Sequence, residues 1–136
     1  MLRVVADTNI FISALNFGGT CDEVLSLARR NRIVIFVSPP ILQEIQGVLR
    51  VKFGWSASKT REALNAIRAF TRLVAPQKSI HIIKEDEPDN RILECALEAR
   101  ATAVVTGDGH LRKLHRYQGI EIQSPAEFLE SRPWVD

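Results

Sequence analysis

The sequence has few of the residues that hold transition metals or form disulfides, with two cysteines and three histidines among 136 residues. Cys21 and Cys95 are far apart and show neither a CxxC motif nor a Cys/His spacing, which argues against a zinc finger or a redox motif. Both fall in helical patterns, so we interpret them as small core residues of a protein in a reducing, cytoplasmic environment. A domain of this length buries a sizeable core without a disulfide or a structural metal.

Long apolar runs and aromatic motifs are also missing. No stretch approaches the roughly 18 residues of a membrane span, and no signal-peptide pattern precedes the first predicted strand, so we expect no membrane association. Aromatic residues make up 7% of the chain, and Trp55 and Trp134 are isolated, which argues against an RNA-binding motif of the RRM type. The net charge of +2 is too small to indicate nucleic-acid binding by itself.

What the sequence does contain is an alternation of short β-rich runs with helical patterns. Strands are predicted at residues 2–6, 33–37, 80–83, 103–106 and 120–123. Helices are predicted to open at the Ser-Pro steps of SPPIL and SPAEF, and the longest helix is predicted from about 57 to 74. Because the strands are largely apolar throughout, we expect an α/β fold with a mostly parallel sheet of about five strands, covered on both faces. We find no linker and treat residues 1–136 as one domain.

Four acidic residues fall on one edge of this predicted sheet. In a right-handed βαβ arrangement, the carboxyl ends of the strands and the amino ends of the following helices share an edge, where ligands of open α/β sheets bind. Asp7 ends the first strand, and Asp108 follows the fourth in VVTGDGHL. Glu44 lies in the second turn of the helix after the second strand. Asp89 lies in the first turn of the helix that begins EPDNRILECALEA.

The position of Glu44 on its helix can be tested on a helical wheel at about 100° per residue. It falls at the border of a buried stripe, which consists of Ile41, Ile45, Val48 and Leu49. A carboxylate at the edge of a buried face is unfavourable unless something compensates for it. No basic residue stands three or four positions away to pair with it. We therefore treat Glu44 as a candidate member of the acidic site.

Each acid alone also fits a structural role. Asp7 and Asp108 are typical turn or N-cap residues. Asp89 suits the positive end of a helix dipole, and Glu44 fits a solvated helix position. Together, however, four like charges would converge without a partner, which is unfavourable unless a divalent cation binds among them. A carboxylate-only set favours Mg²⁺ or Mn²⁺ over zinc. One or two such ions polarise a phosphodiester and lower the pKa of a bound water, so the predicted chemistry is phosphodiester hydrolysis.

Four stretches of the chain carry a resemblance to a known family. They are VVADTNIFISAL, SPPILQEIQGVL, DEPDNRILECALEARATAVVTGDGHL and the closing SPAEFL. In this order they resemble the PIN-domain nucleases, with the closest likeness to the VapC-like toxins of bacterial and archaeal toxin–antitoxin systems. No single motif is strong alone, but the ordered set is specific and extends from residue 4 to residue 129.

The resemblance implies a three-layer α/β/α fold and a ribonuclease that depends on Mg²⁺ or Mn²⁺. By motif position, the catalytic and metal-binding acids are Asp7, Glu44, Asp89 and Asp108. The polar residues expected to orient water or the carboxylates are Asn9, Asn90 and Thr106. Relatives of this kind usually pair as homodimers and are inhibited by an antitoxin encoded beside them, so the implied partners are RNA, an antitoxin and a second copy. Asp86 is an alternative to Asp89, because it is also acidic and stands three residues earlier.

Two groups of basic residues are candidates for contact with RNA phosphates. On the longest predicted helix, one side carries Arg61, Arg68 and Arg72. The second group follows the last acid and consists of Arg112, Lys113 and Arg116. We slightly favour the second group for RNA because it lies nearer the predicted metal edge. A solvated helix face and an antitoxin contact are the alternatives.

Other functions fit the residues less well. A phosphatase of the haloacid-dehalogenase type needs a second Asp two residues after the first, where this chain has Asn9. A response-regulator receiver needs paired acids after its first strand and a late lysine, and neither is present. A binding module that has lost catalysis, and a nuclease outside any toxin system that acts on another RNA or a structured DNA, stay open as alternatives. None of the histidines is assigned to catalysis, and His110 is interpreted as a helix-starting residue.

Overall fold

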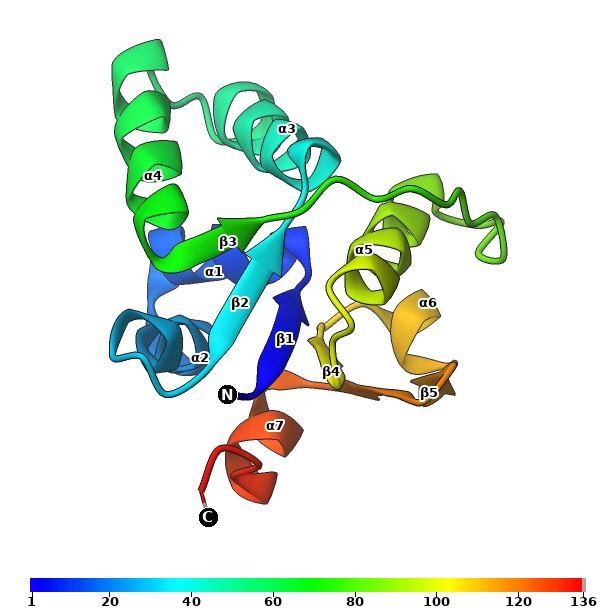
Figure 1. The fold of residues 1–136 in the computed structure, drawn as a ribbon. Coiled ribbons are helices and arrows are strands. Elements are labelled where there is room, and N and C mark those ends of the chain that lie inside the picture. Colours follow the sequence, from blue (N-terminus) through cyan, green and yellow to red (C-terminus); the bar gives the residue numbers. More distant parts are fainter. Residues whose placement is uncertain (136) are drawn as a thin grey trace.

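The computed structural model describes residues 1–135 and has one mixed sheet with helices on both faces (Figure 1). Its strands are β1 (Arg3–Ala6), β2 (Val34–Val37), β3 (Thr71–Leu73), β4 (Ala103–Val105), β5 (Arg116–Tyr117) and β6 (Ile120–Gln123). They lie in the order β3-β2-β1-β4-β6-β5. All neighbouring strands run parallel except β5, which is antiparallel to β6. The predicted α/β class and mostly parallel sheet are confirmed, with six strands rather than about five.

The helices form the two outer layers of the fold. They are α1 (Thr8–Phe17), α2 (Gly19–Arg29), α3 (Pro39–Gly47), α4 (Ala57–Phe70), α5 (Glu87–Glu98), α6 (Gly109–Arg112) and α7 (Pro125–Ser131), and a π-helical turn η1 (Val48–Lys52) follows α3. α1, α2 and α7 gather on one face, whereas α5 packs against β1, β2 and β4 on the other (Figure 1). The three-layer α/β/α arrangement is thus confirmed. Within residues 1–135, no helix has both the length and the apolar composition that a membrane crossing requires.

The topology places a ligand-binding edge between β1 and β4. The chain leaves β1 toward β2 and β3, returns across the sheet through α5, and leaves β4 in the opposite direction toward β6. The carboxyl ends of β1 and β4 therefore meet where the direction of the connections reverses, which is the usual binding position in open α/β sheets. The two strand ends are joined directly, because the Asp7 N–H donates to the Val105 carbonyl at 3.0 Å.

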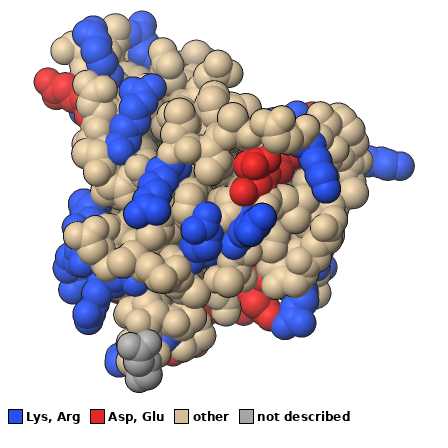
Figure 2. Space-filling model, viewed as in Figure 1, with Lys and Arg blue, Asp and Glu red and all other residues tan. Residues whose placement is uncertain are grey.

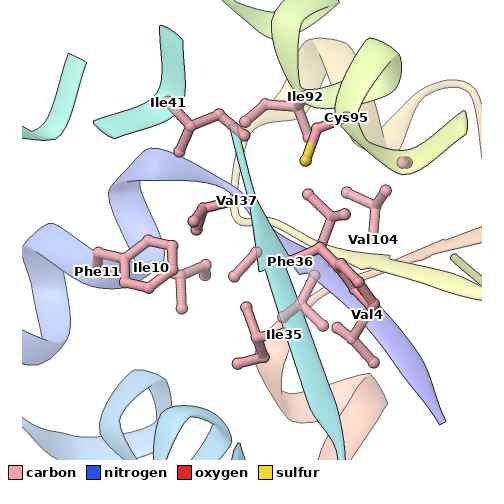
Figure 3. Packing of buried hydrophobic residues seen from close by; sticks show 14 of the residues in the cluster. Val4, Ile10, Phe11, Ile35, Phe36, Val37, Ile41, Ile92, Cys95 and Val104 are labelled. Atoms are coloured by element: carbon pink, nitrogen blue, oxygen red, sulfur yellow. The ribbon is translucent and has the colours of Figure 1, made fainter. Parts of the chain in front are cut away.

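The core is built on both faces of the central strands (Figure 3). Along β2, Ile35 and Val37 point to one side and Phe36 points to the other, as the two-residue period of a strand requires (Figure 3). Ile10 and Phe11 of α1 pack on the first side, and Ile92 and Cys95 of α5 lie on the second (Figure 3). Burial raises the pKa of the Cys95 thiol to about 12, which agrees with its interpretation as a small core residue.

The prediction of a strand at 80–83 is wrong, because the side chains of α5 bind this segment instead. Asn90 accepts from the Ile83 N–H at 3.0 Å and donates to its carbonyl at 2.8 Å. Glu94 accepts from the Ile80 N–H at 2.8 Å, and Arg91 donates to the Ile80 carbonyl at 3.1 Å. Ile80 and Ile83 are buried while the two residues between them are exposed, so the apolar run has no two-residue period.

The longest helix ends four residues earlier than predicted, and the strand β3 takes its place. At Thr71 the backbone turns extended, with φ −122° and ψ 167°, and the Thr71 hydroxyl donates to the Ile67 carbonyl at 2.8 Å. Residues 71–73 then pair with β2. The apolar spacing that reaches Val74 predicted helix, whereas pairing with the edge of the sheet favours an extended backbone at these residues. Arg72 therefore lies on a strand and does not share a helix face with Arg61 and Arg68.

Replacing Asn90 with alanine should loosen the segment that leads into α5. Asn90→Ala leaves the buried N–H and carbonyl of Ile83 without partners, which should lower the free energy of unfolding by about 1–3 kcal/mol. Urea denaturation measures this loss, and amide hydrogen exchange should show faster exchange at 80–86. Asn65→Ala, an exposed change on α4, is the matched control and should stay within about 0.5 kcal/mol of the wild type. Equal stability of the Asn90 and Asn65 variants would contradict the prediction.

Candidate metal centre

Asp7 is held in place by two hydrogen bonds at the end of β1. Its Oδ1 accepts from the Asn9 backbone N–H at 2.9 Å, and its Oδ2 accepts from the Thr106 hydroxyl at 2.5 Å. The residue is 4% exposed, and burial raises the pKa of its carboxyl, with further increases from repulsion by Asp108 and Asp86 and decreases from the two hydrogen bonds. Asp7 also serves as the N-cap of α1, so the structural role and the predicted site position coincide.

Thr106 connects Asp7 to the next acid. Its fully buried hydroxyl donates to Asp7 and accepts from the Asp108 N–H at 2.9 Å. Asp108 caps α6, with its Oδ1 accepting from the backbone N–H groups of His110 at 2.8 Å and Leu111 at 3.2 Å. These hydrogen bonds, which run from Asp7 through Thr106 to Asp108, thus fix the ends of β1 and β4 relative to each other.

Asp89 and Asp108 form a closely coupled carboxyl pair. Asp89 is 6% exposed, and burial, a hydrogen bond shared with Asp108 and repulsion from Asp108, Asp86 and Asp7 raise its pKa to about 8. Burial would also raise the pKa of Asp108, but the shared hydrogen bond, the two capping N–H groups and the charge of His110 lower it overall. The pKa values of the two carboxyl groups therefore shift in opposite directions, which favours a proton on Asp89 rather than on Asp108.

Asp89 and Asp108 belong to a tighter group that includes two further residues. Asp86, Asp89, Asp108 and His110 each offer one ligand atom, and all four atoms lie within 4.8 Å of one another. The sequence left Asp86 and Asp89 as alternatives for one position, and the structure brings both into this group. His110 was not predicted to take part, although its place two residues after Asp108 in GDGHL was the available indication.

Glu44 lies at the margin of the acidic region, half-buried on α3 as the helical wheel predicts. Burial raises the pKa of its carboxyl, a hydrogen bond with Thr8 lowers it, and repulsion from Asp7 and Asp86 raises it further. Thr8 is buried beside Asp7 at the start of α1. Its role was missed because a Thr after an N-cap Asp has no distinguishing sequence pattern.

Two of the polar residues expected around the acids have other contacts. The Asn90 amide bonds Ile83 and Glu87, so it positions the segment that carries Asp86 rather than facing the acids. Asn9 reaches Asp7 only through its backbone N–H, and its side chain is exposed. Of the three, only Thr106 contacts one of the predicted site acids through its side chain.

The donor set fits a hard or borderline divalent cation. Among the described residues, the buried Asp89 Oδ2 atom has no hydrogen-bond partner. The pKa values of Asp7, Glu44 and Asp89 are raised mainly by burial and further by repulsion from neighbouring acids. A cation removes both the unpaired oxygen and the repulsion. Carboxylate oxygens are the ligands that Mg²⁺ and Mn²⁺ prefer. Of the four predicted acids, Asp89 and Asp108 belong to the group whose ligand atoms lie within 4.8 Å of one another, together with Asp86. Asp7 and Glu44 lie outside this group, although the charge of Asp7 raises the pKa of both Asp89 and Glu44.

The basic group after Asp108 is largely paired with acids. Arg112 contacts Glu127 at 3.3 Å, and Arg116 forms an ion pair with Glu121. Lys113 is exposed. These pairs leave little unpaired positive charge in this group, which weakens the initial preference for it as an RNA contact.

The other basic group divides between two hollows. Arg61 and Arg68 of α4 line a hollow of about 400 Å³ between α4 and the α3–η1 segment, together with Gln46, Arg50 and Thr60. Arg72 lines a separate hollow beside Phe70 and Arg29. Lys and Arg side chains gather over the region of α4, with few acids among them (Figure 2). Among the described residues, Arg50, Arg61 and Arg68 form no ion pair. We call the hollow lined by Gln46, Arg50, Thr60, Arg61 and Arg68 the α3–α4 groove.

A family model and one relative match most of the chain. A model of the PIN domain matches residues 3–110. A protein of Methanocaldococcus jannaschii, described as uncharacterized, is 32% identical over 143 aligned positions, which cover 95% of this chain and 90% of that protein. The match to the PIN domain model includes the segments that carry Asp7, Glu44, Asp89 and Asp108.

Three solved structures share the fold. VapBC2 from Rickettsia felis, bound to a DNA fragment from its promoter, has a TM-score of 0.65 and 17% identity over 90% of this chain and 98% of that chain. DNA-bound VapBC from Salmonella typhimurium has a TM-score of 0.62 and 19% identity over 92% and 99%. VapBC-1 from nontypeable Haemophilus influenzae has a TM-score of 0.61 and 18% identity over 92% and 99%. At these identities the likeness concerns the arrangement of helices and strands.

Replacing Asp89 with asparagine should stabilise the metal-free protein at alkaline pH. The pKa of Asp89 is about 8 in the folded state against 3.8 for an ordinary Asp, so the stability that its proton provides is complete below pH 4 and is lost as the pH rises through 8. Asp89→Asn retains a neutral side chain, and in EDTA at pH 8 it should exceed the wild type by about 1–3 kcal/mol. Urea denaturation at pH 5 and pH 8 should show the difference at pH 8 and little at pH 5.

The matched control for this change is Glu62→Gln, which neutralises an exposed acid on α4. It should leave the pH dependence of the unfolding free energy unchanged. A metal-free Asp89→Asn protein that is less stable than the wild type at pH 8 would show that the carboxylate is compensated by a contact other than a cation.

Proposed function

This chain belongs to the PIN domain family, and from that membership we propose that it is a divalent-metal-dependent ribonuclease that hydrolyses phosphodiester bonds of RNA. The observation that carries the proposal is the group of carboxylates at the start of α5 and after β4, Asp86, Asp89 and Asp108, in which the buried Asp89 Oδ2 has no hydrogen-bond partner among the described residues and repulsion contributes to the raised pKa of Asp89. Such a group is unfavourable without a cation, and phosphodiester cleavage is a characteristic use of carboxylate-held Mg²⁺ or Mn²⁺.

The residues of the site have two kinds of proposed role, binding the cation and orienting a ligand. Asp7, Glu44, Asp89 and Asp108 supply carboxylate oxygens to the cation, which when bound polarises a phosphodiester and lowers the pKa of water. Thr106 fixes the orientation of Asp7, because its hydroxyl donates to Oδ2 while it accepts from the Asp108 N–H. This second contact makes the orientation of Asp7 depend on the position of α6.

We propose the α3–α4 groove as the surface that holds RNA phosphates away from the cleaved bond. Three guanidinium groups without acidic partners line it, and Arg binds phosphate well. Glu44 and Gln46 are two residues apart on α3, hence about 200° apart around its axis. α3 therefore separates the acids from the groove, and an RNA strand that uses both sites passes over this helix. The basic group after Asp108 is the weaker candidate because of its ion pairs.

We further propose that the protein is the toxin component of a toxin–antitoxin pair. Support comes from the three structural neighbours, all of which are VapBC proteins, two of them bound to DNA. By this analogy the protein forms a homodimer and binds a cognate antitoxin in the cytoplasm. A PIN nuclease that processes another RNA or a structured DNA, and a PIN domain without catalysis, are the outcomes that would replace this proposal.

Substitution of Asp7 should abolish cleavage. The purified wild-type protein should cut a mixed set of structured RNAs with Mn²⁺ or Mg²⁺ and should stop in EDTA, while Asp7→Asn should lose at least about 100-fold in rate, because it removes a ligand charge from the site. Gel analysis of end-labelled RNA measures this. Asp22→Asn, which neutralises an exposed acid on α2 that pairs with Arg29, is the control and should cleave normally. Cleavage that persists in EDTA would contradict metal dependence.

The same pair of proteins tests the toxin role in cells. Expression of the wild type, but not of Asp7→Asn, should arrest growth, and co-expression of the gene encoded beside it should restore growth. Unimpaired growth with a protein that is active in vitro would favour a nuclease outside a toxin system.

Charge reversal in the α3–α4 groove should weaken RNA binding while the acids of the candidate metal centre stay unchanged. The double change Arg61→Glu and Arg68→Glu should lower affinity at least about tenfold and reduce the slope of log affinity against log salt by about 1.4, the value for two lost phosphate contacts on a single strand. Fluorescence anisotropy in EDTA at several salt concentrations measures both. The matched control is Arg30→Glu with Arg32→Glu. These two exposed residues precede the amino end of β2, whereas α3 follows its carboxyl end. Equal losses in the two double variants would indicate a nonspecific charge effect.

A further inference from the structure

The His110 ring faces the acids with an unused nitrogen. The side chain is 40% exposed, but its Nδ1 atom is buried, has no hydrogen-bond partner among the described residues and lies 3.8 Å from the Asp108 Oδ1. A ring nitrogen of His110 also belongs to the group in which all ligand atoms lie within 4.8 Å of one another. A buried imidazole nitrogen normally has a partner, so this position points to a ligand that completes its contacts.

Asp86 is a second residue of this group whose side chain forms no hydrogen bond or ion pair among the described residues. It occupies the N-cap position of α5, where an Asp side chain ordinarily accepts from the second or third backbone N–H, yet it makes no capping hydrogen bond. Its backbone carbonyl accepts from the Asp89 N–H instead. The two hydrogen bonds between the Asn90 amide and the Ile83 backbone hold the segment before α5 in place. The Asp86 carboxylate therefore lies near Asp89 without a hydrogen bond to the backbone of α5.

The spacing of these groups matches the size of one coordination sphere. Metal–oxygen and metal–nitrogen bonds of about 2.1 Å place opposite ligands of an octahedral ion roughly 4.2 Å apart. The observed limit of 4.8 Å needs only small side-chain adjustments to reach this value. The unpaired Oδ2 of Asp89, a residue 6% exposed, is an independent indication that a ligand belongs there.

We propose that Asp86 and His110 are ligands of the cation together with Asp89 and Asp108, and that the imidazole makes the site prefer Mn²⁺ to Mg²⁺. Imidazole nitrogen binds first-row transition ions, whereas Mg²⁺ retains oxygen ligands and water. A carboxylate at the same position would give an all-oxygen site without this preference. The inference deepens the proposed metal-dependent nuclease and rests on it, but it concerns which ion binds rather than whether RNA is cut.

Metal titration of the full-length protein tests this assignment. Isothermal titration calorimetry of EDTA-treated protein with MnCl₂ and MgCl₂ should give tighter binding of Mn²⁺ to the wild type. His110→Ala should weaken Mn²⁺ binding by at least about tenfold, as expected for altered ligation, and should change Mg²⁺ affinity by a smaller factor. The control is His81→Ala, which removes an exposed imidazole that contacts Glu87 outside the group, and it should bind both ions as the wild type does.

A second variant keeps the test decisive if the alanine change disturbs α6. His110→Asp restores a charged ligand at the same position, so it should bind Mn²⁺ well but lose the preference over Mg²⁺. Retention of wild-type affinities and preference by both His110 variants would overturn the inference and leave His110 as a neighbour of Asp108 only. In that case RNA cleavage lost in Asp7→Asn would still support the nuclease, whereas a wild type that binds neither ion would overturn both proposals.

Discussion

The hydrogen bond from the Thr106 hydroxyl to Asp7 joins the ends of two neighbouring parallel strands, and the acidic site depends on this contact. Thr106 is fully buried and also accepts from the Asp108 N–H, so one hydroxyl sets the relative positions of two carboxylates. Because those carboxylates repel each other, their positions must be fixed by the core rather than by mutual attraction. The apolar packing of α1 and α5 on the two faces of β1 and β2 supplies this rigidity.

The general fold was predictable because its determinants are local and repeated. Four of the five predicted strands are present, and a helix opens at the Ser-Pro step of Ser124 as predicted, where Ser124 and Glu127 form a capping box. The failures occur where tertiary contacts override local pattern. At 80–83 the partners are side chains of α5, which lie 7 to 14 residues away in sequence. From Thr71 the chain pairs with the edge of β2, although its apolar spacing predicts that the helix would continue.

The candidate site was partly predictable for a different reason. The ends of β1 and β4 share an edge in any right-handed α/β sheet, so Asp7 and Asp108 could be placed from strand positions alone. The inclusion of Asp86 and His110 depends on side-chain direction, since both occupy helix-start positions where a purely structural role is equally common. Likewise Asn90 has the expected residue type near the site, but its amide is engaged by the backbone of Ile83.

The dependence of segment 80–83 on α5 also has an evolutionary consequence. The segment is bound to Asn90, Arg91 and Glu94 rather than to a strand, so the sheet register does not pass through it. Insertions or deletions between β3 and Ile80 would leave the register of the parallel strands intact. Divergence in length should therefore accumulate in this connection, while Asn90, Arg91 and Glu94 should be retained even where Ile80 and Ile83 vary, because they bind backbone groups of these two residues.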